Sequence, residues 1–400
     1  MSGLGGYAAV TAAYWSFMLT DGALRMLVLL HFHRLGFAPT TLAWLFVLYE
    51  VAGIVTNLVA GWLAARFGLA STLIAGLALQ IAALAALTQL DAGWTMAASV
   101  VFVMLVQGAS GVAKDLTKTA SKSAVKLLIP QGQGARLYAW VAALTGSKNA
   151  VKGLGFFLGA ALLGALGFAP ALWVMAAALA AVLLAIVVFL PGGLTARAKD
   201  ATFRQVFARD PRINRLSLAR LFLFAARDVW FVVALPIWLA GYLAQGMATE
   251  RAFFFTGGFM ALWIVFYGAV QAVAPRFGAG TVARGVGWVA ALAVATAALA
   301  ALAAARPEAG GWILGGLLVF GAVFAVNSAL HSFLILDFAG AGRVTLDVGF
   351  YYMANAAGRL LGTVLSGLAY QAGGLTLALG ASAALAAASG LALRSIRLQP

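Results

Sequence analysis

Long apolar runs follow one another along this chain of 400 residues and limit what it can fold into. A helix needs about 20 apolar residues to cross a bilayer, and twelve segments reach that length. Only 9% of the residues are charged, against about 25% in a soluble protein. We therefore predict an all-α integral membrane protein. The predicted spans are 9–33, 40–65, 70–90, 95–117, 138–166, 169–190, 215–243, 251–275, 284–305, 311–336, 345–370 and 374–394.

The longest polar break divides these helices six and six. We expect an N-terminal bundle over residues 1–190, a basic cytoplasmic linker over 191–214 and a C-terminal bundle over 215–400. Two features recur in both halves. Arg66-Phe67-Gly68 is matched by Arg276-Phe277-Gly278, 210 residues later, and Arg25 is matched by Arg227, 202 residues later. Internal repeats of this kind place a substrate site near the bilayer midplane, between the halves.

Basic residues are concentrated in the loops of one side. With a cytoplasmic N-terminus, the inner loops and tail hold sixteen lysines and arginines, and the outer loops hold only Arg34, Arg251 and Arg306. Cytoplasmic loops collect such residues, so both termini should be cytoplasmic. The same bias accounts for the net charge of +15 without a nucleic-acid partner. The chain has no cysteine, which excludes disulfides and thiolate metal sites.

Seven cations lie inside the predicted spans, where facing lipid would cost each roughly 2.5–3.5 kcal/mol. The favourable place for them is a shared, water-filled cavity in which an anion meets them. This distribution predicts an anion transporter with two pseudo-symmetric halves. The seven are Arg25, Lys114, Lys148, Lys152, Arg220, Arg227 and Arg359.

Arg25 and Arg227 are the leading candidates for direct contact with substrate, because a guanidinium matches the oxygens of phosphate or carboxylate. The alternative is that each arginine pairs only with an acidic neighbour. Asp21 lies one turn from Arg25, and Asp228 is adjacent to Arg227.

The remaining cations divide by position. Lys148 and Lys152 share one helix face, where an anion could bind between them or where an acid such as Asp21 or Glu50 could neutralise one. Lys114 begins a lysine stripe and could line the cavity. Arg359 has no acid within one turn and is expected to line the cavity, whereas Arg220 is nearer the cytoplasmic end and is expected to snorkel.

Five acids lie within the spans and could carry protons or serve as ion-pair partners. They are Asp21, Glu50, Asp115, Asp228 and Asp347. Histidines occur only at 31, 33 and 331, too scattered for a metal or catalytic centre. No nucleotide-binding motif is present. We therefore expect no enzymatic activity, no metal and no cofactor.

Twelve helices split by a basic loop resemble the major facilitator superfamily. The stretch 61–68 resembles its loop motif between helices 2 and 3, with Ala65 where the family carries an acid. In that family helices 3, 6, 9 and 12 lie on the outside of the molecule. Here these helices carry no ionisable residue away from their ends, in keeping with the resemblance.

Several stretches resemble ArsJ-type organoarsenical exporters within that superfamily. These stretches are 19–25 with 31–33, 49–58, 110–116, 145–153 and 226–236. The resemblance implies export of 1-arseno-3-phosphoglycerate across a bacterial inner membrane by a monomer. It also implies a functional link to glyceraldehyde-3-phosphate dehydrogenase, which would make this compound from arsenate. A carrier of another phosphorylated metabolite or organic anion predicts the same cationic cavity and stays open as the alternative.

Overall fold

The computed structural model describes residues 3–91, 93–128, 134–189, 210–274, 281–338 and 344–396, and these residues form helices and no strands. The helices are α1 (Gly3–Arg34), α2 (Pro39–Trp44), α3 (Val47–Phe67), α4 (Leu69–Leu87), α5 (Met96–Leu128), α6 (Gly134–Leu166), α7 (Phe168–Phe189), α8 (Pro211–Phe231), α9 (Ala234–Ala244), α10 (Thr249–Val273), α11 (Val282–Ala305), α12 (Gly310–Phe338) and α13 (Val344–Arg394).

The helices of the described ranges account for the predicted crossings. Ten helical stretches are long and apolar enough to span a membrane, counting α2 with α3 and α8 with α9 as continuous. One of them, within α13, turns back at Gly373 and Gly374, where Gly374 has a φ of +62° that favours glycine. With α1, a helix of 32 residues, these stretches make the twelve crossings that the apolar runs predict. The all-α membrane fold is therefore confirmed.

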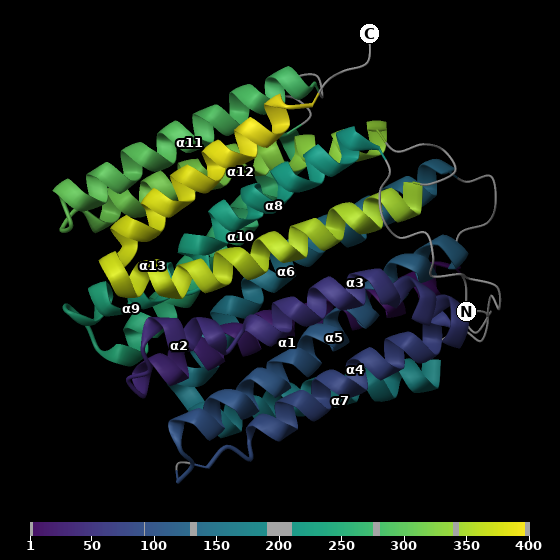
Figure 1. The fold of residues 1–400 in the computed structure, drawn as a ribbon. Coiled ribbons are helices and arrows are strands. Elements are labelled where there is room, and N and C mark those ends of the chain that lie inside the picture. Colours follow the sequence, from purple (N-terminus) through teal and green to yellow (C-terminus); the bar gives the residue numbers. More distant parts are fainter. Residues whose placement is uncertain are drawn as a thin grey trace.

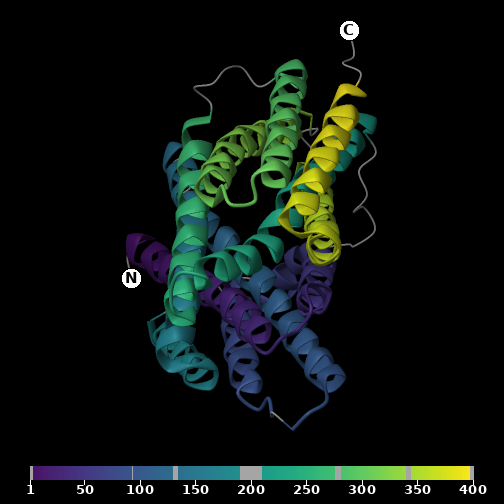
Figure 2. The same cartoon turned by 90° about the vertical axis from the view of Figure 1, so that its left-hand side faces the viewer.

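The helices gather in two groups that lie side by side (Figure 1). Helices α1–α7, purple to blue, form one group, and α8–α13, teal to yellow, form the other; Figure 2 shows the same groups from the side. The groups meet where α6 packs on α10 and where α13 packs on α2 and α3. The start of α1 and the end of α13 lie at the same end of the bundle. The predicted linker lies outside the described residues up to residue 209, as does Arg276-Phe277-Gly278, so the domain boundaries stay a prediction.

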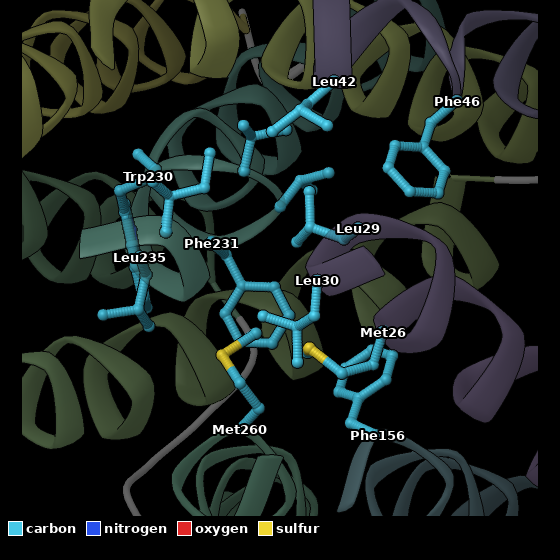
Figure 3. Packing of buried hydrophobic residues seen from close by; sticks show 14 of the residues in the cluster. Met26, Leu29, Leu30, Leu42, Phe46, Phe156, Trp230, Phe231, Leu235 and Met260 are labelled. Carbon is cyan, nitrogen blue, oxygen red and sulfur yellow. The ribbon is translucent and has the colours of Figure 1, made fainter. Parts of the chain in front are cut away.

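One apolar core joins the two groups at the end opposite to the termini. It contains residues of α1 beyond Ala23 together with residues of α8, α9, α10 and α12. In Figure 3, Met26, Leu30, Phe156, Phe231 and Met260 converge from both groups. At the terminal end, by contrast, the groups have separate cores, one within α1–α7 and one within α8–α13. Among the described residues, these cores close the two halves against each other at one end only.

Glycines allow the closest helix contacts within each half. On α6, Gly155 and Gly159 are four residues apart and lie against the backbone of α1, where a Cβ would overlap Leu19 and Ala23. On α13, Gly358 and Gly362 lie against α8 in the same way. The two pairs are 203 residues apart (155 to 358 and 159 to 362). Small residues at this spacing let membrane helices approach closely, and they extend the internal repeat that Arg25 and Arg227 suggested.

A break between α8 and α9 follows from Pro236, which cannot donate the hydrogen bond that a continuous helix requires. The backbone leaves helical geometry at Val233. The N–H groups of Val233 and Ala234 donate instead to Ser366 Oγ of α13, at 3.2 and 3.1 Å. Backbone polar groups freed within a membrane need such internal partners. The break lies little more than one turn beyond Asp228.

Candidate functional site

Five charged side chains form a chain of alternating sign between the two halves. Glu50, in the first turn of α3, accepts from Arg25 Nη2 of α1 at 3.0 Å and from Arg359 Nη2 of α13 at 2.7 Å. Arg359 Nε lies 3.4 Å from Asp228 Oδ2, and Arg227 Nη2 lies 2.5 Å from Asp228 Oδ1. The order is Arg25, Glu50, Arg359, Asp228, Arg227. The pseudo-equivalent arginines therefore stand at its two ends.

A second contact set in the N-terminal half surrounds Asp21. Lys152 Nζ of α6 lies 2.5 Å from Asp21 Oδ2, and the Tyr49 hydroxyl donates to Asp21 Oδ1 at 2.6 Å. Asp21 can reach Lys152 because Gly22 and Gly155 bring α1 and α6 into backbone contact at this level. Both oxygens of this buried carboxylate are thereby satisfied.

The Tyr49 ring connects the two sets through cation–π contacts. Lys114 Nζ lies 4.1 Å from its centroid, Arg25 Cζ 5.3 Å and Lys152 Nζ 5.9 Å. An aromatic face within about 6 Å attracts a cation electrostatically. One tyrosine therefore helps to hold three like charges together.

The lysine stripe on α5 begins at the edge of this cluster. Asp115 pairs with Lys118 Nζ at 2.5 Å and lies 3.9 Å from Lys114 Nζ. Thr56 Oγ1 donates to Asp115 at 2.8 Å, and Lys118 also donates to Asn57 Oδ1 at 2.6 Å. Asp115 is thus an ion-pair partner in this conformation, and Lys114 lies between this carboxylate, at 3.9 Å, and the Tyr49 ring, at 4.1 Å from its centroid.

Positive charge exceeds negative charge in the central cluster, which we define as five cations and three carboxylates. The cations are Arg25, Lys114, Lys152, Arg227 and Arg359, and the carboxylates are Asp21, Glu50 and Asp228. Each carboxylate side chain is at most 1% exposed, whereas the cations retain 10% to 20%. The carboxylates are therefore covered, and the exposed part of the central cluster consists of cations. Such a surface attracts an oxyanion.

The structure decides several pairings that the sequence left open. Arg25 pairs with Glu50, and Asp21 is taken by Lys152. Arg227 does pair with its neighbour Asp228. Arg359 has no acid within one turn of its own helix, and Glu50 and Asp228 reach it from other helices. The surplus of cations remains even with these pairs formed.

Two further predicted residues lie on α6 and α13. Lys148 is half-buried one turn before Lys152 on α6, and binding of an anion between the two stays a prediction. Asp347 is buried in the first turn of α13. It lies twelve residues from Arg359, which is roughly 18 Å along a helix, so it does not join the central cluster.

The expectation that Arg220 would snorkel to the cytoplasmic surface is wrong. It is only 4% exposed. Its Nε donates to Asn355 Oδ1 at 2.9 Å, and its Nη1 donates to the carbonyl and hydroxyl oxygens of Ser328. The side chain therefore points into the C-terminal half. Asn355, one turn before Arg359 on α13, accepts this hydrogen bond from Arg220.

Sequence reasoning missed the role of Tyr49, which contacts Asp21 and three cations. Its position beside Glu50 was only a weak signal, because residues adjacent on a helix usually face different directions. Phe46 was missed too, although Arg25 Cζ lies 4.9 Å from its ring. The short break between α2 and α3 places Phe46 at this level, and no pattern in the sequence marks that break.

Comparisons with known proteins agree with this architecture. Residues 6–363 match the Major Facilitator Superfamily. No curated protein matches the sequence. Solved structures with a similar fold include a POT family transporter in complex with a thioalcohol-conjugated peptide, at 13% identity and a TM-score of 0.75, covering 96% of this chain and 94% of that one.

Two further structures are similar to the same degree. A POT family transporter in complex with 5-aminolevulinic acid has 12% identity and a TM-score of 0.74, over 96% of this chain and 94% of that one. The nucleoside transporter NupG has 15% identity and a TM-score of 0.73, over 98% of each chain. These likenesses concern the fold. The chain belongs to the major facilitator superfamily and is a multi-pass membrane transporter of a small molecule.

Proposed function

We propose that this transporter carries multiply charged oxyanions and that its substrate is 1-arseno-3-phosphoglycerate, which it exports. One observation carries the proposal: five cations from both halves face three buried carboxylates in the central cluster. Guanidinium and ammonium groups bind hard, doubly charged oxyanions well. A neutral or cationic substrate would leave the surplus of positive charge uncompensated.

Glu50 acts as an internal stand-in for the substrate. Its carboxylate holds Arg25 of the N-terminal half and Arg359 of the C-terminal half at once. An arriving phosphate or arsenate group presents more acceptor oxygens and more charge, so it takes both arginines. The ion pair between Glu50 and Arg359, which joins the halves directly, is then replaced by ion pairs of both arginines with the substrate. Alternating access follows when the halves rock about this substrate-filled site.

The resemblance to organoarsenical exporters supplies the identity of the substrate within this class. Its phosphate and arsenate groups are oxyanions of pentavalent elements, which suit arginine and lysine. The chain has no cysteine, whereas trivalent arsenic, a soft ion, favours thiolate ligands. The proposal includes a bacterial inner membrane with both termini in the cytoplasm, a monomer, and supply of the substrate by glyceraldehyde-3-phosphate dehydrogenase.

Energy coupling resides in the acids of the same cluster. When an oxyanion displaces Glu50 or Asp228, the freed carboxylate is left buried without its counter-ion and becomes a proton acceptor. That proton would cross with the substrate and be released on the side where the substrate leaves and the carboxylate pairs with its arginines again. Exchange against a second anion is the alternative, in which the returning anion restores the charge balance and no carboxylate changes its protonation.

Arsenate tolerance tests the identity of the substrate. An arsenate-sensitive bacterium would express the chain with the dehydrogenase, without it, or with an inactive dehydrogenase. We expect tolerance only when both active proteins are present. Tolerance independent of the dehydrogenase would contradict the organoarsenical. No tolerance, together with uptake of radiolabelled 3-phosphoglycerate into proteoliposomes, would instead establish the alternative carrier of phosphorylated metabolites.

A further inference from the structure

A second cationic centre lies in the C-terminal half, around Arg220. This arginine is 4% exposed, and no carboxylate of the described residues forms an ion pair with it. Its hydrogen bonds go to the neutral oxygens of Asn355 and Ser328. Its Cζ lies 4.1 Å from the ring centroid of Phe224 and 5.0 Å from that of Tyr351. A buried cation held only by neutral groups is incompletely compensated.

The groups around Arg220 are rich in donors and poor in acceptors. The Ser328 hydroxyl oxygen accepts hydrogen bonds from Arg220 Nη1 at 3.1 Å, from the Tyr267 hydroxyl at 3.3 Å and from Gln271 Nε2 at 3.4 Å. The hydrogen bonds that Arg220 makes with the described residues use its Nε and Nη1. One serine oxygen cannot satisfy all these donors well. An anion supplies the acceptors that the protein lacks here.

His331 provides an independent sign of a missing ligand. It is fully buried on α12, three residues after Ser328, and neither ring nitrogen has a hydrogen-bond partner among the residues that the structure describes. Positions 328 and 331 share one face of α12, and Ser328 on that face accepts from Arg220. Buried polar groups without partners are rare in native structures and call for an explanation. A bound oxyanion would accept from the N–H of this ring.

The Arg220 centre and the central cluster lie along one face of α8. Arg220 and Arg227 are seven residues apart, which is two turns or roughly 10 Å along the helix. Phe224 lies between them, with its centroid 4.1 Å from Arg220 Cζ and 4.8 Å from Arg227 Cζ. These two distances together limit the separation of the guanidinium carbons. That separation suits a short carbon chain with an oxyanion group at each end.

We propose that the transporter binds two-headed anions, one oxyanion group at the central cluster and the other at Arg220, Ser328 and His331. This inference rests on the proposed function, since it assumes an oxyanion at the central cluster, and it adds the second subsite. The ligand class is a three-carbon chain that carries a phosphoryl, arsonyl or similar group at both ends. One-headed anions occupy the central cluster alone.

A matched pair of stable probes tests the second subsite. Propane-1,3-bisphosphonate carries two phosphonate groups, and propylphosphonate carries one on the same chain. Titration calorimetry on the purified wild-type protein should show that the two-headed probe binds at least about tenfold more tightly. If neither probe binds, the proposed anion transport and the second subsite are both overturned.

Variants of α8 test the second subsite separately from the anion site at the central cluster. Arg220→Gln should abolish the preference for the two-headed probe and leave the affinity for propylphosphonate unchanged, whereas Arg227→Gln should weaken both probes. Arg220→Lys, which keeps the buried charge, should retain an intermediate preference and confirm that the helix still folds. Arg212→Gln, on the same helix but paired with Asp210, is the control and should bind like the wild type. An undiminished preference in Arg220→Gln and Arg220→Lys, or an equal loss for both probes, would overturn the second subsite alone.

Discussion

Arg359 and Glu50 are 309 residues apart in the sequence, and their side chains lie 2.7 Å apart across the two halves. Glu50 also holds Arg25, and Arg359 also approaches Asp228. The pair thus joins the charged residues of one half to those of the other. Breaking a buried ion pair by removing one partner is costly, because the other charge stays buried alone. An incoming anion avoids that cost by replacing the carboxylate.

Glu50→Gln should strengthen anion binding, because the substitution removes the internal competitor for Arg25 and Arg359. We expect the dissociation constant of propane-1,3-bisphosphonate to fall by about tenfold, which corresponds to about 1.4 kcal/mol. The melting temperature without ligand should fall, since two buried arginines lose their counter-ion. Titration calorimetry and thermal unfolding in detergent measure these effects. Glu308→Gln, at an exposed pair with Arg306, is the control, and equal or weaker binding by Glu50→Gln would contradict its role.

Locking the closed end should stop transport. The Thr40 hydroxyl of α2 lies 2.5 Å from Gln371 Oε1 of α13, in an exposed contact between the halves. The natural chain has no cysteine, so Thr40→Cys with Gln371→Cys gives one pair for a short bifunctional thiol reagent. Cross-linking should abolish substrate flux in proteoliposomes, and cleavage of the linker should restore it. Each single-cysteine variant should stay active after the same treatment. Full flux in the completely cross-linked protein would show that this end need not open.

Removing the Tyr49 hydroxyl should destabilise the cluster without dispersing it. Tyr49→Phe keeps the ring that Lys114, Arg25 and Lys152 contact but takes the donor from Asp21. Hydrogen bonds to charged groups contribute about 1.5–3 kcal/mol, so the melting temperature should fall by several degrees. Tyr242→Phe serves for comparison, because that hydroxyl makes no hydrogen bond within the described part of the chain. An unchanged melting temperature for Tyr49→Phe would mean that Asp21 does not depend on this donor.

Much of the fold and part of the site could be predicted from the sequence, for a physical reason. Apolar length sets the crossings, and the cost of a cation in lipid singles out Arg25, Lys152, Arg227 and Arg359. The partners could not be predicted, because ion pairs such as Arg359 with Glu50 depend on how helices far apart in sequence are packed. Arg220 was misjudged for the same reason. Its depth along α8 suggested snorkelling, but α12 and α13 supply polar partners that hold it inside.

The glycine contacts of α6 should be essential to the position of Lys152. A Cβ at Gly159 would overlap the backbone of α1 at Ala23, so Gly159→Ala should push the helices apart. Overpacking of this kind costs about 1–3 kcal/mol, and both the melting temperature and transport should fall. Gly287→Ala on α11 adds the same methyl group where nothing lies within 4 Å, and it should have little effect. Equal stability of the two variants would contradict the close packing of α1 on α6.

The account rests on cations of both halves that bind one transported anion, and arsenate tolerance of the arginine variants tests this most directly. Arg25→Gln and Arg227→Gln would each be expressed with the dehydrogenase in an arsenate-sensitive bacterium, and their amounts in the membrane would be matched to the wild type by immunoblot. Arg284→Gln, at the exposed start of α11, is the control. We predict that both cluster variants lose tolerance and that the control keeps it. Wild-type tolerance in both cluster variants would contradict the central claim.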